Sequence, residues 1–238
     1  MPDILNSIRV AFGLLVGFDT TLLHVVVLSL TVSLSASGAA TVCGLPLGAA
    51  LAVFRFRGRH LVILLANALL GLPPVVVGLG LYLLLSRSGP FGRLGILFTP
   101  TAMIVAQFML VLPIVVALSH RAMVGIWRDY GDDLLVSGAS RFRAIPHLLS
   151  IGRLEALTAS LAGFGRSVSE VGAILIVGGN IAGYTRTMTT AIMLETSEGH
   201  LGFALALGLV LIVISIAVNA CAFGIEARAR RVTPREAA

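Results

Sequence analysis

Arg166 and Glu170 are the only pair of opposite charges within the long apolar runs of this 238-residue sequence. At a spacing of i and i+4 they share one face of a helix and can neutralise each other. Ionisable residues inside a membrane segment are costly, so by default they suggest a function, and we count the neighbouring Ser169 with them. A structural ion pair is the alternative interpretation, because a paired arginine is a poor ligand for a free anion.

A second polar group lies in the threonine-rich segment 180–200. Its hydroxyl groups and its guanidinium could hydrogen-bond a tetrahedral oxyanion. The residues concerned are Thr185, Arg186, Thr187, Thr189 and Thr190. A capping or re-entrant segment would explain the same residues, so both interpretations stay open.

Several kinds of catalytic or metal site are missing from the sequence. It contains no lysine, and a P-loop requires a lysine that reaches the β- and γ-phosphates, so this chain is not itself a P-loop ATPase. The five histidines are dispersed without metal-ligand spacing, and no Ser/His/Asp or paired-carboxylate arrangement is visible. Cys43 and Cys221 both lie in apolar runs, where small packing residues are expected. We therefore expect neither an enzyme nor a metal site.

The segment 121–153 is a long polar island between apolar runs. Its pattern predicts two short amphipathic helices broken at Gly138, a residue that can adopt conformations closed to other residues. Its apolar residues are expected to face a partner protein, with Arg141 and Arg143 at the rim; they are Leu134, Leu135, Phe142, Ile145, Leu148 and Leu149. An amphipathic loop lying on lipid headgroups is the alternative.

The elements that must position these groups are membrane helices. Hydrophobic residues make up 57% of the chain and charged residues 12%, against about 25% charged in soluble domains. The sequence predicts an all-α polytopic membrane protein with five spans, at about 20–54, 61–84, 98–119, 154–181 and 201–224. The first span is long enough to tilt, to extend beyond the bilayer or to break near 44–46. The segment 1–19 is expected to form an amphipathic interfacial helix, and a sixth short span is the alternative.

Pro73 and Pro74 stand in the middle of the second predicted span. They remove two backbone donors and are expected to distort the helix, as in transporters whose broken helices line a cavity. A simple packing kink is the alternative.

Arginine bias predicts the orientation. Twelve arginines fall in three segments that would share one side of the membrane, namely residues 55–60, the polar island and the tail 226–238. Four arginines fall in the segments on the other side. The island and the C-terminus are therefore expected in the cytoplasm and the N-terminus outside.

The polar island resembles the coupling loop of bacterial ABC importer permeases. Asp132 stands at the usual glutamate position, Asp133 and Leu134 replace alanines, and the run Gly138, Ala139, Ser140, Arg141 matches and leads into Phe142. The usual later Leu-Pro is absent, with Ser150 and Ile151 in its place.

The resemblance extends over most of the chain. The segments 71–78, 84–92 and 165–173 are similar to the molybdate, tungstate and sulfate importer permeases. The segments 177–181 and 185–192 resemble the tungstate branch most closely.

This resemblance implies a type I ABC importer transmembrane domain over residues 20–225, in a bacterial inner membrane. It implies a homodimer, two P-loop ATPase subunits that bind ATP and Mg, an extracytoplasmic binding protein that delivers tungstate, and no nucleic acid partner. The candidate pathway residues are then Pro73, Pro74, Arg166, Ser169, Glu170, Thr185, Arg186, Thr187, Thr189 and Thr190. Alternatives are a molybdate or sulfate permease, an ATP-independent channel or transporter, and a membrane-embedded enzyme.

Overall fold

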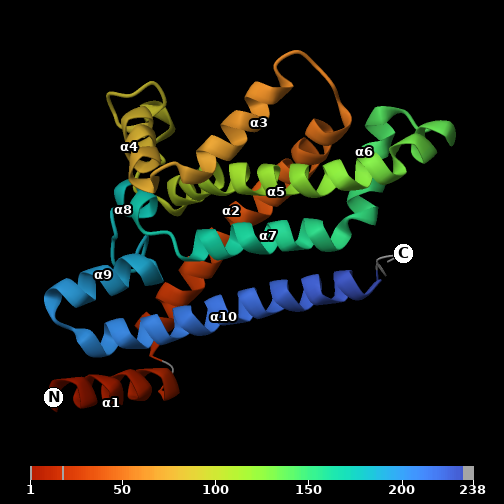
Figure 1. Ribbon diagram of the computed structural model, residues 1–238. Helices are drawn as coiled ribbons and strands as arrows, with labels where there is room; N and C mark the ends of the chain where they lie inside the picture. Colours follow the sequence, from red (N-terminus) through yellow and green to blue (C-terminus); the bar gives the residue numbers. More distant parts are fainter. Residues whose placement is uncertain (1, 18, 233–238) are drawn as a thin grey trace. The chain divides into compact units, whose positions relative to one another are not determined.

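The computed structural model describes residues 2–17 and 19–232, and in this part of the chain every regular element is a helix (Figure 1). The α-helices are α1 Pro2–Val16, α2 Thr20–Val53, α3 Arg59–Ala68, α4 Pro74–Leu85, α5 Pro100–Val136, α6 Arg141–Ile151, α7 Arg153–Val168, α8 Gly172–Gly178, α9 Met188–Glu198 and α10 Leu201–Val232. Two short 3-10 helices are η1 Leu69–Gly71 and η2 Gly92–Leu94. The prediction of an all-α protein is confirmed.

Three helices, α2, α5 and α10, are long and apolar enough to cross a membrane. Two bent helix pairs, α3 with α4 and α7 with α8, raise the number of candidate spans to five if each pair counts as one. The five predicted spans therefore all have helical counterparts. The 15 residues of α1 are fewer than the roughly 20 that a span requires, and whether this helix lies at the membrane interface stays a prediction.

The long first span does not break near 44–46. Helix α2 is continuous over 34 residues and keeps Pro46 inside it. The second span does break, with a bend of 103° between α3–η1 and α4. Leu72 and Pro73 are both extended at this point, because a residue that precedes a proline is driven out of the helical region and Pro74 can then begin the next helix.

The fourth predicted span, 154–181, is also two helices rather than one. Helix α7 ends at Val168 and α8 begins at Gly172, with a bend of 59° between them. At the other end of the chain, α10 continues to Val232 without a break at residue 226, where the tail was expected to begin. Residues 233–238 of that predicted tail lie outside the described residues.

The chain divides into two compact units. The first contains residues 1–36, 73–108 and 166–217, and the second contains residues 37–72, 109–165 and 218–238. The polar island 121–153 belongs to the second unit, and the candidate pathway residues belong to the first.

Within the first unit, α4 packs directly against α8, and the two helices lie side by side in Figure 1. A Cβ atom at Gly78 would lie 2.9 Å from the backbone Cα of Ala173, so glycine is needed for this close approach. Around Gly80, two residues further along α4, a Cβ would meet no atom within 4 Å.

We expect Gly78→Ala to destabilise the protein by about 1–3 kcal/mol, because the backbone of α8 cannot move aside cheaply. Gly80→Ala is the matched control, and we expect it to stabilise the helix by up to about 1 kcal/mol. Thermal unfolding of the detergent-solubilised protein measures both. Equal unfolding temperatures for the two variants would show that α4 and α8 do not pack this closely.

Within the second unit, the core joins the end of α2 to α5 and α6. Its buried residues are Ala49, Ala52, Val53, Met123, Ile145 and Leu148. Trp127 and Leu134, further along α5, pack against the same cluster. These contacts explain why α5 extends 17 residues beyond the predicted end of the third span at Ser119, since its second half has an apolar surface to cover.

Candidate functional site

The predicted break in the polar island lies where it was expected, at the end of α5. Gly138 has a φ of 85°. The Gly138 N–H donates to the Leu135 carbonyl at 3.0 Å, and the Ala139 N–H donates to the Leu134 carbonyl at 3.1 Å. This pair of bonds is the Schellman motif, which ends a helix with a glycine in the left-handed region. The prediction of two short helices is corrected here. The segment before the break is the end of the long helix α5, and only the segment after it, α6, is a separate short helix.

Helix α6 begins immediately after this turn. The Ser140 side chain caps it by accepting a hydrogen bond from the Arg143 N–H at 3.4 Å. The Schellman motif and the cap together fix the direction in which the chain leaves α5 and enters α6. The run of Gly138, Ala139, Ser140 and Arg141 is therefore a defined turn between two helices.

The structure divides the apolar residues of the polar island into two sets. Ile145 and Leu148 are buried against α2 and α5, and Leu134 and Leu149 are partly buried there. We expected all four to face a partner, and that expectation was wrong for Ile145 and Leu148, because both are buried in the protein's own core, where they anchor α6. For the partly buried Leu134 and Leu149 it stays a prediction. Leu135 and Phe142 remain exposed, and Phe142 has 74% of its surface accessible.

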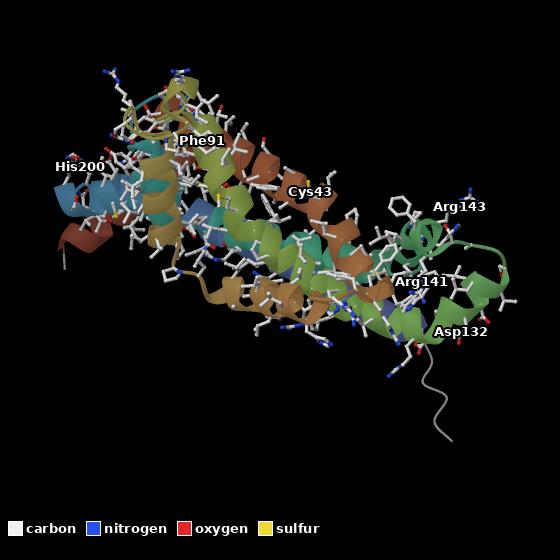
Figure 2. The ribbon with its side chains drawn as sticks, turned by 90° about the horizontal axis from the view of Figure 1, so that it is seen from above. Cys43, Phe91, Asp132, Arg141, Arg143 and His200 are labelled. Atoms are coloured by element: carbon white, nitrogen blue, oxygen red, sulfur yellow. The ribbon has the colours of Figure 1, made fainter. Side chains whose placement is uncertain are left out.

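The exposed side of the α5–α6 turn combines apolar and charged groups. Asp132, Asp133, Arg141 and Arg143 are all exposed. In Figure 2, Asp132, Arg141 and Arg143 lie around this turn of the second unit. An anchored helix that presents an exposed aromatic ring among charges has the composition of a protein interface.

In the first unit, Arg166 and Glu170 form an ion pair with 2.5 Å between Nη1 and Oε2. Helix α7 ends at Val168, so Glu170 lies beyond the helix that contains Arg166. The ion pair therefore joins the end of α7 to the segment that leads into α8. The other oxygen of Glu170 accepts a hydrogen bond from the Ala173 N–H at 3.2 Å, at the start of α8. Glu170 is only 3% exposed and both its oxygens have partners, which favours the structural interpretation of this pair.

The four candidate threonines, Thr185, Thr187, Thr189 and Thr190, are buried and hydrogen-bonded within the first unit. Thr185 donates to the Gly178 carbonyl, and Thr189 donates to the Glu170 carbonyl. Thr187 and Thr190 form a capping box at the start of α9. These hydroxyls hold α8 and α9 in place, so the geometry favours the capping interpretation for the four threonines.

The remaining pathway candidates lie at the helix breaks of the first unit. Pro73 and Pro74 form the start of α4, next to α8. Ser169 is exposed at the end of α7, where its hydroxyl donates to the Arg166 carbonyl at 3.3 Å. These residues and the ion pair surround the two bends, whereas Arg186 lies in the separate loop before α9.

Arg186 differs from its threonine neighbours because its guanidinium donates no hydrogen bond to the described residues. Its nearest carboxylate is Glu195, with 3.6 Å between Nη1 and Oε1. Its Nε is buried and has no hydrogen-bond partner among the described residues, and 23% of the side chain is exposed.

Sequence reasoning missed a cluster at the end of α9. His200 lies 3.0 Å from Glu195 and 3.6 Å from Glu198, and one ligand atom from each of the three residues falls within a 4.8 Å group. The spacing of Glu195 and Glu198, one helical turn apart, was a signal for this cluster. Because acidic groups at a surface often gather without an ion, the cluster does not by itself identify a metal site.

Sequence reasoning also missed a buried polar contact in the first unit. The Gln107 amide donates to the Ser167 carbonyl at 3.0 Å and accepts from the Ser167 hydroxyl at 2.8 Å. Gln107 is 2% exposed. A lone glutamine in an apolar run was the available signal, and its partner 60 residues away was not predictable from spacing.

Comparisons with known proteins agree with this architecture, although no family model matches the chain. It is 36% identical to the tungstate uptake system permease protein TupB of Peptoclostridium acidaminophilum, over 95% of this chain and 99% of that one. It is 39% identical to a probable anion ABC transporter permease protein of Haloferax volcanii, over 90% of this chain and 93% of that one. It is also 39% identical to TupB of Campylobacter jejuni, over 70% of each chain.

More distant relatives, at 28–31% identity, are permease proteins of molybdenum and sulfate transport systems. The resemblance inferred from the coupling loop and from the sequence segments between residues 71 and 192 is thus confirmed, and the chain is a multi-pass membrane protein. This chain belongs to the family of ABC transporter permease proteins that includes the tungstate uptake permeases.

Proposed function

We propose that this protein is the permease subunit of an ABC importer that carries tungstate into the cytoplasm. The observation that carries the proposal is the similarity over nearly the whole chain to tungstate uptake permeases, combined with the exposed and anchored α5–α6 turn. Molybdate or sulfate is the alternative substrate, because permeases of those systems are also relatives.

The α5–α6 turn is the proposed docking site for the ATPase. Residues Asp132, Asp133, Phe142 and Arg141 are exposed, and the buried side of α6 fastens the turn to α5 and α2. A force applied to α6 would therefore be transmitted to two long helices rather than absorbed by a flexible loop. ATP hydrolysis belongs to two partner subunits with their own ATP and Mg, since this chain lacks the P-loop lysine.

The proposed assembly is a homodimer in the inner membrane. A chain with at most five spans is small for enclosing a gated pathway alone, which supports two copies. Arginine bias supports a cytoplasmic C-terminus and an outer N-terminus, with α1 at the membrane interface. An extracytoplasmic binding protein delivers the anion, and the membrane pathway passes it on weakly. We propose no bound cofactor and no catalysis in this chain.

The test is reconstitution of the permease in liposomes with its ATPase and binding-protein partners. We expect ATP-dependent uptake of tungstate, measured as vesicle tungsten by mass spectrometry, and at least ten-fold less uptake of sulfate at equal concentration. Uptake that continues without ATP would instead identify a channel or an ATP-independent transporter.

In the same vesicles, Phe142→Asp is expected to reduce uptake at least ten-fold, because a charge replaces the exposed ring at the proposed interface. His147→Asp is the matched control, since His147 is also exposed on α6 but points about 140° away around the helix. Equal uptake by the two variants would remove α6 as the docking helix.

A further inference from the structure

Two neighbouring cavities of the first unit share Arg186. The first, of about 250 Å³, is lined by Thr20, Thr21, His24, Val25, Ala182, Gly183 and Arg186. The second, of about 350 Å³, is lined by Leu14, Asp19, Thr21, Val25, Arg186, Glu195, His200 and Phe203. Arg186 therefore lines one cavity that contains carboxylates and one whose lining has none.

The first cavity has the chemistry of a small anion site. Its lining contains no carboxylate. Its polar side chains are the guanidinium of Arg186, the imidazole of His24 and the hydroxyls of Thr20 and Thr21. Its volume is below the roughly 300–1,000 Å³ of sites for drug-sized ligands, so an ion of a few atoms is the matching ligand.

The unused hydrogen-bonding capacity of Arg186 points to the same conclusion. Buried polar groups almost always have partners, and an arginine has five N–H donors arranged to hold oxyanions. Arg186 donates none of these to a described residue, and its contact with Glu195, at 3.6 Å, is too long for a hydrogen bond.

The start of α2 adds a second source of donors. Thr20 and Thr21 are the first two residues of this helix, so the helix itself leaves their backbone N–H groups without acceptors. The Asp19 carboxylate accepts from the Leu22 N–H at 2.9 Å, which satisfies the next donor along the helix. The positive end of a 34-residue helix therefore borders the same cavity as Arg186.

From this juxtaposition we propose that Arg186, His24, Thr20 and Thr21 form a transient binding site for a tetrahedral oxyanion, in which Glu195 competes for the guanidinium. The inference rests on the proposed function and deepens it by naming where the anion contacts this chain. Competition from Glu195 keeps the affinity low, as a site that must release its ligand requires. Arg166 does not take part, because Glu170 already neutralises it.

Thiol protection tests the site without the ATPase or the binding protein. The full-length permease is purified with Cys43→Ala, Cys221→Ala and Ala182→Cys, and its reaction with the neutral reagent methyl methanethiosulfonate is timed. We expect tungstate to slow the reaction at least five-fold, whereas chloride at equal ionic strength leaves it unchanged. Tyr184→Cys in the same background is the control, since Tyr184 is exposed but outside the cavity lining. No protection, or equal protection by chloride, overturns the proposal.

Two neutralising variants separate anion binding from a purely structural ion pair. Arg186→Gln should raise the tungstate concentration for half-protection at least ten-fold, while Glu195→Gln should lower it several-fold. Arg93→Gln, at an exposed arginine of η2, should change nothing. If Arg186→Gln does not fold, the lowered value for Glu195→Gln decides alone, because a structural ion pair predicts loss in both variants.

Adding sulfate and phosphate to the protection series identifies the anion class, and preference for tungstate supports a substrate site. Preference for phosphate over tungstate would assign the cavity to a lipid headgroup or free phosphate and overturn the substrate role. A wild-type protein that transports tungstate but shows no protection would leave the proposed function standing without this site. Protection of the Ala182→Cys thiol by tungstate in a protein that takes up no tungstate would leave the anion site standing but would overturn the proposed transport function.

Discussion

Gly138→Val is expected to reduce anion-stimulated ATP turnover of the complex at least ten-fold while the permease stays folded in the membrane. Gly138 holds a φ of 85°, which costs an ordinary residue about 1–2 kcal/mol and a β-branched residue more. A Cβ at this position would meet no atom within 4 Å, so crowding adds nothing to this cost. The strain acts only on the turn, and the turn sets the direction of α6.

The measurement is ATP hydrolysis in proteoliposomes that contain the permease, the ATPase and the loaded binding protein. Gly138→Asn is the matched control, because asparagine tolerates the left-handed region and should retain most of the activity. Thermal unfolding of each variant checks that the membrane domain is intact. If valine and asparagine support equal turnover, the geometry of the turn does not couple the two subunits.

Glu170→Ala is expected to cause the largest loss of stability among single substitutions in the first unit, about 3 kcal/mol. Removing Glu170, the buried partner of the ion pair, leaves the charge of Arg166 uncompensated, although that side chain is 36% exposed. The variant also removes the acceptor for the Ala173 N–H at the start of α8. Glu170 is 3% exposed, so water cannot replace the lost contacts.

For a protein of this size, that loss corresponds to an unfolding temperature lower by roughly 6–12 °C, measured in detergent. Glu198→Ala is the control, because that carboxylate is 49% exposed and should change the midpoint by no more than about 2 °C. The double variant Arg166→Met/Glu170→Met should recover much of the loss, since an apolar pair can replace a buried ion pair. A midpoint for Glu170→Ala within about 2 °C of wild type would show that the pair does not hold the bend.

Two patterns in the sequence were sufficient to predict where helices form and where they break, because each depends only on nearby residues. The apolar runs located all five helical segments, since a bilayer requires about 20 apolar residues wherever a chain crosses it. The break at Gly138 was predictable because glycine can adopt left-handed conformations that other residues avoid. The bend at Pro73 and Pro74 was predictable because proline fixes its own φ and donates no backbone hydrogen bond, whatever surrounds it.

Other features depended on contacts between distant segments. Helix α5 continues past Ser119 because Met123 and Trp127 meet the end of α2, about 70 positions earlier in the chain. The same cluster turns Ile145 and Leu148 inward, although the amphipathic pattern of α6 is equally compatible with a partner's groove. Periodicity shows that a helix has an apolar face, but it does not show which surface covers that face.

The candidate anion site shows the same division. The sequence alone identified Arg186 and its threonine neighbours as able to hydrogen-bond an oxyanion. Only the tertiary structure shows that the threonines already form hydrogen bonds within the first unit, while Arg186 lines a cavity together with His24, 162 positions away. Hydrogen-bonding ability belongs to a residue type, whereas its availability depends on which acceptors the folded chain places within reach.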